Sequence, residues 1–495
     1  MIHIPFDNRY ATLGEGFFAR AKPTPVRKPE LIKFNDALAG QLGISTDHAG
    51  ASVAAVFSGN TLPEGAEPLA MAYAGHQFGH FNPQLGDGRA LLLGEISSPE
   101  GAIYAIHLKG SGPTRFSRNG DGRSALGPVL REYLVSEAMQ QLNVPTTRAL
   151  AAVTTGEEVA RERLLPGGVI TRVASSFVRV GTFEYFAARN DYAAVEKLAD
   201  HVIEKCYPQV GAGTNPYAAF LTAVVERQAA LIAQWMQLGF IHGVMNTDNM
   251  SVAGETIDYG PCAFMDAYHH NQVFSSIDHH GRYAYSNQPS IGLWNLTRLA
   301  ETLLPLLDEN PQAAVEVAQA VLEGYAERYA SEWLAGMRVK CGLTACSDTT
   351  DDEDKTLIEA LLDVMADNQA DFTLTFYHLS RLEGQPSALD NDLRNLFDDP
   401  AQIDAWLEKW RKRLTLAPQS DAARQESMRA VNPVYIPRNH RIEAAIRAAE
   451  DEGDFSVFHE LHAVLQNPYV LQEGKEGYMQ APEPDEVVEY TFCGT

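Results

Sequence analysis

The sequence lacks any apolar run long enough to cross a membrane. The best candidate, AALIAQWMQLGF, is interrupted by Gln234 and Gln237. The first ten residues, MIHIPFDNRY, contain no basic head, apolar core or small-residue cleavage site, so no secretory signal is expected. Cysteine is scarce too, and five in 495 residues cannot form a disulfide framework. We therefore expect a cytoplasmic protein that makes no use of a membrane.

Positive charge is also in short supply. Lysine and arginine number 39 against 64 aspartates and glutamates, which gives a formal net charge of −25 at pH 7. This balance argues against nucleic acid and anionic membranes as partners, because nothing general would compensate their phosphate charge. It leaves room for one local phosphate site. At 495 residues the chain is long enough for two or more lobes.

The apolar pattern changes character near residue 180. Between 69 and 180, apolar runs bounded by glycines, such as ALLLGEI, AIYAIHLK and GGVITRVASSFVRV, predict strands. One helix is predicted over 130–142, where leucine and alanine recur at helical spacing. These features predict a smaller lobe that contains the strands and, with an N-terminal arm, covers residues 1–180.

The remainder of the chain has helical periodicity. The clearest helix is predicted over 217–239 and ends on Gly239, a suitable C-cap. Further helices are predicted from IGLWNLTRLAETLLPLL, TLIEALLDVMADNQ, AQIDAWLEKWRKRL and RIEAAIRAAEDEG, whereas the acidic run SDTTDDEDK at 347–355 predicts an exposed loop. We expect a larger helical lobe over 181–495, and hence an α+β fold of two lobes with a nucleotide-sized cleft between them.

Lys109 ends a strand-like run, and Glu132 follows on the predicted helix. A lysine in this place can hold a phosphate as a point charge, and a glutamate on the next helix can fix the lysine, as in protein kinases. Taken alone, Lys109 is more simply explained as a surface residue at a strand end. Glu132 alone is also a weak signal, because many helices contain glutamate.

Two glycine-rich stretches surround Lys109. Gly86 and Gly88 precede it by a distance suited to a loop over a nucleotide, although a hairpin turn explains a bare G-x-G better. The second stretch, KGSGPTRFSRNGDGRSALGPVLR, carries five cations and one acid, Asp121. In so acidic a chain, this reversal of sign favours a phosphate-binding loop over a solvated turn.

Two arginines, Arg172 and Arg179, occur in the otherwise apolar stretch TRVASSFVRVG. A buried guanidinium needs a partner of opposite charge. A carboxylate of the same chain and a nucleotide phosphate are both compatible with this pattern.

The segment HGVMNTDNMSVAGETIDYG follows the predicted helix that ends on Gly239. Its spacing from His242 to Asn249 equals that of the kinase catalytic loop H-R-D-x-x-x-x-N. Its DYG corresponds to the DFG motif of kinases, whose aspartate binds the metal. Asn249 and Asp258 offer the oxygen ligands that Mg²⁺ prefers. The kinase aspartate is absent, because Val244 occupies its position. The acid next to the metal pair is Asp248.

Taken together, these motifs resemble the selenoprotein O family, whose members have a protein-kinase-like bilobal fold and act as protein adenylyltransferases. The resemblance covers nearly the whole chain. It rests on MAYAGHQFG, LGDGRA, HLKGSGPTRFSRNGDGR, HGVMNTDNMS, IDYGPCAFMD, NQPSIGLWNL and NPVYIPRNH.

The resemblance implies a role for each matching residue. Asp248 would be the catalytic base, Asn249 and Asp258 would bind the metal, and Glu132 would support Lys109. The residues implied to line the nucleotide are Gly86, Gly88, Arg89, Lys109, Asp121, Gly122, Arg172, Arg179 and Asp258. The implied substrates are ATP, with Mg²⁺ or Mn²⁺, and the Ser, Thr or Tyr hydroxyls of proteins. ATP would lie flipped relative to ordinary kinases, so that AMP is transferred.

Other functions remain open beside AMP transfer. They are UMP transfer with Mn²⁺ at the same site, ordinary phosphate transfer, and a non-catalytic scaffold. Val244 disfavours phosphate transfer, whereas the retained Lys109, Asn249 and Asp258 disfavour a scaffold. A monomer is favoured.

The chain carries no selenocysteine, and its tail reads YTFCGT. The resemblance suggests that Cys262 and Cys493 form a regulatory disulfide between the tail and the active-site side. Two reduced cysteines, one buried and one in a frayed tail, are an equal alternative, because cytoplasmic disulfides are usually transient.

Overall fold

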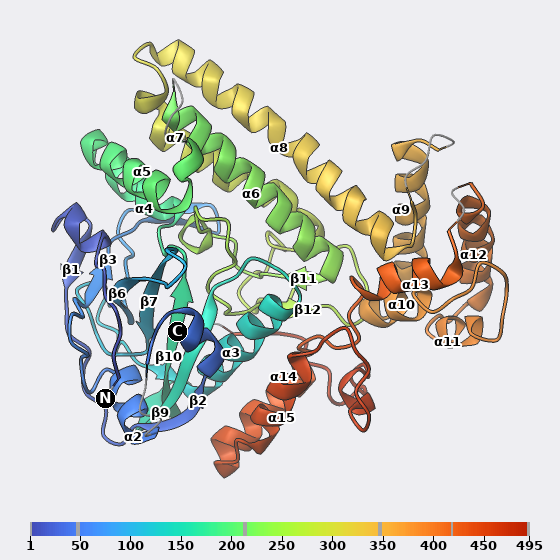
Figure 1. Ribbon diagram of the computed structural model, residues 1–495, viewed down its shortest axis with the longest axis horizontal. Helices are drawn as coiled ribbons and strands as arrows, with labels where there is room; N and C mark the ends of the chain where they lie inside the picture. The colour runs from blue at the N-terminus through green and yellow to red at the C-terminus, as the bar shows by residue number, and fades with distance from the viewer. Residues whose placement is uncertain (1, 46–49, 211–214, 345–348, 417–418, 493–495) are drawn as a thin grey trace.

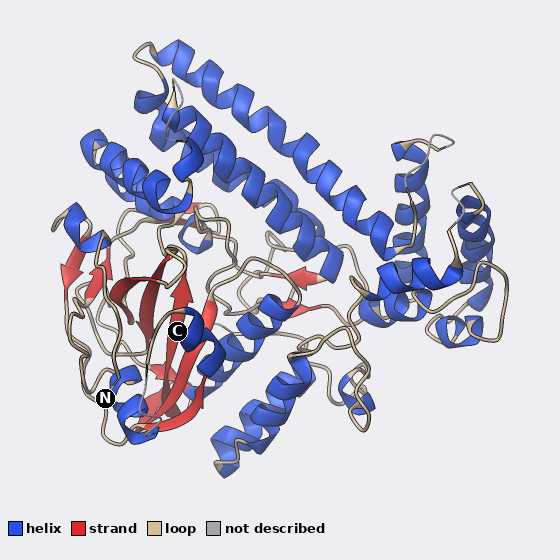
Figure 2. Cartoon of the chain, viewed as in Figure 1, coloured by secondary structure: helices blue, strands red, loops and turns tan. Residues whose placement is uncertain are grey.

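The computed structural model describes residues 2–45, 50–210, 215–344, 349–416 and 419–492. An N-terminal part is built around a sheet, and a larger C-terminal part is mostly helical (Figures 1 and 2). This confirms the predicted α+β, kinase-like bilobal fold. None of the helices in these ranges is long and apolar enough to cross a membrane.

The main sheet has the strand order β1-β3-β6-β7-β10-β9-β2, and β8 pairs with β10 outside this path. Neighbouring strands run antiparallel. The strands are β1 (Phe18–Arg20), β2 (Glu30–Phe34), β3 (Leu69–Met71), β6 (Ala90–Ser97), β7 (Ile103–Lys109), β8 (Ser124–Ala125), β9 (Arg148–Ala160) and β10 (Leu164–Ala174). The predicted strands ALLLGEI and AIYAIHLK are thus β6 and β7. The strand predicted over GGVITRVASSFVRV ends at Ala174, before the second arginine.

Both faces of this sheet are buried. Leu93 and Ile106 pack in a cluster with Phe57 of α2 (Gly50–Phe57). Leu92 and Ala105, their neighbours along the strands, pack in the cluster that contains α3 (Leu126–Gln141). Adjacent strand residues point to opposite faces, so strands covered on both sides carry apolar side chains toward each face.

Helix α3 begins at Leu126, earlier than the predicted start at residue 130. Ala125 supplies no side-chain cap, and the Gly127 N–H instead donates to Glu450 Oε1 over 2.9 Å. A cap that comes from so far along the chain leaves no local signal in the sequence.

Two short two-stranded sheets position loops. One is β4 (Gly75–Gln77) with β5 (His80–Asn82), and the other is β11 (Phe240–Ile241) with β12 (Ala263–Phe264). Because β11 and β12 pair, the two ends of the loop 242–262 are held together. The motif-bearing segment is therefore a closed loop at the base of the helical part.

The helical part starts at α4 (Val180–Ala187), near the predicted change at residue 181. Helix α6 (Pro216–Leu238) ends at Gly239, whose φ of +71° is left-handed, as a glycine C-cap requires. Helices α6, α7 and α8 lie side by side (Figure 1). The remaining helices are α1 (Asp36–Gln41), α5 (Tyr192–Cys206), α7 (Gln288–Leu307), α8 (Pro311–Lys340), α9 (Asp351–Asp367), α10 (Phe372–Leu379), α11 (Asp390–Arg394), α12 (Pro400–Leu414), α13 (Asp421–Arg429), α14 (Asn439–Arg447) and α15 (Ser456–Leu465).

The prediction of a loop over 347–355 is wrong for its described second half, since α9 begins at Asp351. Thr350 caps the helix by accepting from the Glu353 N–H, and Glu353 returns a bond to the Thr350 N–H. Acidic residues in a first helical turn are stabilised by the positive end of the helix dipole. The acidic run therefore starts a helix.

The last helices return to the N-terminal part. Helices α14 and α15 pack against α3 (Figure 1). Just before α14, Arg438 NH1 forms an ion pair with Asp371 at 2.8 Å and another with Asp266. The C-terminal segment therefore contacts both parts of the molecule.

Candidate active site

Asp248 lies in a single 3-10 turn, Thr247–Asn249, and is only 7% exposed. Its backbone carbonyl accepts from Arg179 NH1 over 2.9 Å. Its Oδ2 accepts from Gln77 Nε2 over 3.2 Å, and Oδ1 has no hydrogen-bond partner in the described part of the chain. Asp248 is thus held by Arg179 and Gln77, and its Oδ1 stays without a hydrogen bond in the described ranges.

Burial raises the pKa of Asp248 to about 7, against the opposing effect of Arg179. A carboxyl group with a pKa near neutrality can both accept and release a proton under ordinary conditions. The environment of Asp248 therefore suits a general base.

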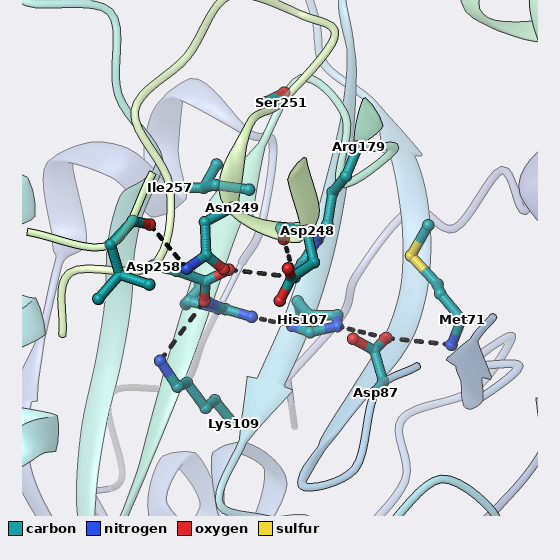
Figure 3. A network of polar contacts seen from close by, with 12 residues as sticks. Met71, Asp87, His107, Lys109, Arg179, Asp248, Asn249, Ser251, Ile257 and Asp258 are labelled. Atoms are coloured by element: carbon teal, nitrogen blue, oxygen red, sulfur yellow. Dashed lines mark hydrogen bonds and ion pairs between the residues drawn. The ribbon is translucent and has the colours of Figure 1, made fainter. Parts of the chain in front are cut away.

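Asn249 is the last residue of this turn, and Asp258 lies next to it (Figure 3). Asn249 Nδ2 donates to the Val244 carbonyl over 3.0 Å, which leaves its amide oxygen as a ligand. Asp258 has a left-handed φ of +58°, a sparsely populated conformation for a residue with a side chain. An amide oxygen and a carboxylate are donors that a hard divalent cation accepts, so the donor set fits Mg²⁺ or Mn²⁺.

Three cations converge on Asp258. Arg172 NH1 lies 2.5 Å from Oδ1, Lys109 Nζ 3.6 Å from Oδ1, and Arg179 NH1 3.1 Å from Oδ2. Burial alone would raise the pKa of Asp258, but Arg179, Arg172 and Lys109 together hold it well below its usual range. These three cations therefore favour the ionised form of Asp258.

Glu132 of α3 binds two of the same cations. Lys109 Nζ donates to its Oε2 over 2.7 Å, and Arg172 NH1 donates to its Oε1 over 3.2 Å. The predicted contact between Lys109 and Glu132 is present. Arg172 and Arg179 have carboxylate partners, the alternative that the sequence left open, although a nucleotide could still compete for them.

The structure also contains a buried relay that the sequence interpretation missed. Arg172 NH2 lies 2.8 Å from His107 Nδ1, and His107 Nε2 lies 3.0 Å from Asp87 Oδ2 (Figure 3). Burial lowers the pKa of His107. A neutral imidazole that accepts from Arg172 and donates to Asp87 satisfies both contacts. A signal existed, because His107 and Lys109 are two residues apart and so share a face of the strand.

The two glycine-rich stretches pack against each other. Gly86 has φ +72°, and a Cβ there would overlap the ring of Phe116. Thr114 Oγ1 donates to the Asp87 carbonyl over 2.5 Å, and the Ser117 hydroxyl donates to the Gly88 carbonyl. Gly86 is therefore required by the close approach of the two loops.

The other predicted nucleotide residues lie in these same loops. Gly122 has φ +66° and a Cβ there would overlap Gly112. Asp121 is exposed and binds Arg161 over 2.8 Å. The Arg89 carbonyl accepts from the Gly110 N–H over 2.7 Å. Within the described ranges, Asp121 forms no hydrogen bond or ion pair with Lys109 or Asp258. The predicted site therefore consists of a charged centre and a pair of glycine-rich loops.

A family model described as "Protein adenylyltransferase SelO" matches residues 1–466. The chain belongs to this family. Among curated relatives, a protein from Rhizobium johnstonii named "Protein nucleotidyltransferase YdiU" is 59% identical over 491 residues, which are 99% of this chain and 97% of the relative. Proteins of the same name from Rhodopseudomonas palustris strain BisB5 and Bradyrhizobium diazoefficiens are 59% and 57% identical over 495 residues, with both chains of each pair covered in full.

Membership of the SelO family makes the chain a nucleotidyltransferase, and it confirms the suspected family and enzyme class. The individual residue roles remain predictions. Within the SelO chain, the structure brings together the charged centre, whose members are Lys109, Glu132, Arg172, Arg179, Asp248, Asn249 and Asp258.

Sequence reasoning also missed the hairpin β4–β5, which covers the turn Thr247–Asn249. The His76 N–H donates to Thr247 Oγ1 over 2.6 Å, and His76 Nδ1 lies 2.5 Å from Glu184 Oε1. A Cβ on Gly75 would lie 2.5 Å from Asp248 Oδ1. The hairpin therefore fits closely over Asp248 Oδ1, the oxygen without a hydrogen bond.

Cys262 is buried just after the metal loop, and Cys493 lies outside the described residues. The tail nevertheless approaches Cys262, because the Thr491 hydroxyl donates to the Pro261 carbonyl over 2.6 Å. The pairing of these two cysteines stays a prediction.

Proposed function

We propose that this chain transfers AMP from ATP to Ser, Thr or Tyr hydroxyls of acceptor proteins and releases pyrophosphate. The observation that carries the proposal is the buried Oδ1 of Asp248, which has no hydrogen-bond partner in the described ranges and lies beside Asn249 and Asp258. The relatives are named protein nucleotidyltransferases, and the matching family is described as an adenylyltransferase, which supports a protein acceptor and an adenylyl donor.

In this mechanism the acceptor hydroxyl oxygen attacks the α-phosphorus of ATP. The bond between the α-phosphorus and the bridging oxygen to the β-phosphate breaks, and Asp248 Oδ1 takes the hydroxyl proton. A base with a pKa of about 7 is sufficiently deprotonated for this at neutral pH.

Asn249 and Asp258 would hold the divalent metal. When bound, the metal would neutralise charge on the triphosphate. The low pKa of Asp258 keeps this ligand ionised, and the hydrogen bond from Asn249 to Val244 keeps the amide oriented.

Lys109, Arg172 and Arg179 would bind the triphosphate. As the bond to the α-phosphorus breaks, negative charge builds on the leaving pyrophosphate, and nearby cations stabilise it. In the chain alone these cations are held by Asp258 and Glu132. They are therefore already in place before the nucleotide arrives, and reorganisation costs little.

The deciding experiment uses ATP labelled at either the α or the γ phosphate, with Mg²⁺ and a mixture of acceptor proteins. We expect label from the α position only. Asp248→Asn should reduce transfer by about 10² to 10⁴, the usual contribution of a general base. Asp367→Asn, an exposed aspartate of α9, is the matched control and should leave transfer unchanged.

Other outcomes would redirect the proposal. Label from the γ phosphate only would indicate a kinase, and no label with intact nucleotide binding would indicate a scaffold. A repeat with labelled UTP and Mn²⁺ tests UMP transfer, and faster labelling from UTP than from ATP would replace AMP as the transferred group.

A further inference from the structure

A cavity of about 500 Å³ opens beside the catalytic turn. Its wall includes Phe78 from the tip of the β4–β5 hairpin and a segment that follows the metal loop. The residues of that segment used below are Ile277, Asp278, His279, His280 and Arg282. None of them belongs to the charged centre that handles the nucleotide.

The cavity is tied directly to Asp248. Gln77, which donates to the Asp248 carboxylate, is the neighbour of Phe78. The Phe78 N–H donates to Asn246 Oδ1 over 3.1 Å, and the Tyr283 hydroxyl donates to the same oxygen over 2.6 Å. A molecule in the cavity therefore touches residues that are one or two contacts from the base.

Asp278 also lines the cavity, but both of its oxygens accept from backbone N–H groups. Its Oδ1 accepts from the Arg282 N–H over 2.9 Å and its Oδ2 from the Tyr283 N–H over 2.8 Å. It is 6% exposed. Both oxygens are used to fold the segment.

Arg282 is the cation that remains at the cavity wall. Its guanidinium lies over the Trp294 ring, 4.9 Å from the centroid, and its Nε is buried without a hydrogen-bond partner in the described ranges. Within those ranges no carboxylate lies within ion-pair distance of it. His279 and His280 are exposed at the same wall. In a chain of net charge −25, this is a local site for a negative group.

The cavity also offers apolar surface. Ile277 is 56% exposed, although isoleucine is among the most commonly buried residue types. Together, Ile277 and Phe78 form an apolar side of the cavity. An exposed apolar residue next to a cation that forms no ion pair in the described ranges is typical of a recognition surface.

We propose that this cavity binds the acceptor protein through an acidic side chain close in sequence to the hydroxyl residue that is modified. The carboxylate would pair with Arg282, and an adjoining apolar side chain would lie against Ile277 and Phe78. The proposal rests on the proposed function and adds the kind of acceptor that the site selects. The hairpin must move for any hydroxyl to reach Asp248 Oδ1, and an acceptor in this cavity contacts its tip.

Matched peptides test this inference. Each contains one hydroxyl residue and carries Asp or Asn at one flanking position at a time. With the wild-type chain, the best Asp peptide should exceed its Asn partner in kcat/KM by about tenfold, the worth of one charge-assisted hydrogen bond. Arg282→Gln should abolish that preference through a higher KM for the Asp peptide, with the Asn peptide unchanged.

Two further variants separate charge from structure. Arg282→Lys keeps the charge and should retain part of the preference. Arg429→Gln, an exposed arginine at the end of α13, should retain all of it. Equal labelling of Asp and Asn peptides at every position, or an equal loss on both peptides in Arg282→Gln, overturns this inference alone. Failure of the wild-type chain to label any peptide or protein from α-labelled ATP overturns the proposed function as well.

Discussion

Gln77 donates to the carboxylate of Asp248, and this single contact has a measurable consequence. Because hydrogen bonds to an ionised carboxylate lower its pKa, removal of Gln77 should raise the pKa of Asp248 above its value of about 7. The base works only when it is deprotonated. Wild-type activity should therefore rise with pH through about 7, and Gln77→Leu should move this rise to higher pH.

The pH dependence of kcat/KM for AMP transfer measures this effect. At the alkaline end of the profile, Gln77→Leu should approach the wild-type rate. Gln319→Leu, an exposed residue of α8, serves as the control. A profile displaced to lower pH, or an equal loss at every pH, would contradict the assignment of Asp248 as the titrating base.

His107 offers a second test at this scale, since it links the glycine loop to Arg172 through Asp87. His107→Leu takes one hydrogen bond from Arg172 and one from Asp87, which keeps the bond from the Met71 N–H, and a buried polar group left unsatisfied costs about 1–3 kcal/mol. Arg172 then loses its fixed position, so we expect a higher KM for ATP and a lower unfolding midpoint. His107→Gln can accept from one neighbour and donate to the other.

Steady-state kinetics with ATP varied, together with thermal unfolding, separate these effects. A positioning role requires that His107→Gln recover part of the ATP affinity. If His107→Leu loses stability but keeps the wild-type KM for ATP, His107 is structural only.

The sequence motifs suffice to predict which of the charged residues lie together. Lys109, Glu132 and Asp258 were predicted to belong to one site, and they share it. Two residues were missed although both lie in quoted motifs: His107 is two residues before Lys109, and Gln77 lies in MAYAGHQFG, but its contact with Asp248 forms only in the folded chain. No local pattern reports that a hairpin lies over a loop far away in sequence.

At the scale of elements, periodicity predicted helices α3, α6, α7, α9, α12 and α14 and strands β6, β7 and β10, but it predicted neither α8 nor the hairpin β4–β5. Two of the predicted helices also begin at other residues than expected. The start of α3 depends on Glu450, and the start of α9 depends on the capping box of Thr350 with Glu353. The first of these is a tertiary contact. The capping box is present in the sequence, but the acidic run was interpreted as an exposed loop, and the start of the helix was therefore missed.

The contact between α4 and the hairpin can be tested with one glycine. A Cβ on Gly181, at the start of α4, would overlap the Ala74 carbonyl oxygen, and the Ala74 N–H donates to the Gly181 carbonyl over 2.9 Å. Gly181→Ala must therefore push the two backbones apart. We expect a loss of roughly 1–3 kcal/mol in stability, typical of overpacking, and a larger fractional loss of AMP transfer.

The matched control is Gly324→Ala in the middle of α8, where a Cβ would meet no atom within 4 Å. Alanine in a helix interior is more stable than glycine by about 0.5–1 kcal/mol, so this variant should raise the unfolding midpoint without changing activity. Denaturant unfolding and the transfer assay measure both quantities. A Gly181→Ala variant as stable and active as Gly324→Ala would exclude the close contact.

At the scale of the molecule, the site is assembled from both parts of the chain. Lys109, Glu132 and Arg172 come from the sheet and α3, whereas Asp248 and Asp258 come from loops of the helical part. Arg438, fully buried, holds the segment before α14 to Asp266 and Asp371 of the helical part, and α14 and α15 then pack against α3. The assembly of the site therefore depends on how the two parts are held, including the C-terminal segment.

The tail provides the last prediction, because it docks beside the metal loop. Thr491 donates to the carbonyl of Pro261, the residue before Cys262, and the resemblance implies that Cys493 pairs with Cys262. We expect a mild oxidant to link the two cysteines and raise the unfolding midpoint, since closing so long a loop contributes up to about 5 kcal/mol in the chain-entropy model. Mass analysis of unreduced peptides should detect the link in the wild type and in Cys206→Ser, but not in Cys493→Ser. A linked peptide that survives in Cys493→Ser, or none in the wild type, would show that the tail carries no such switch.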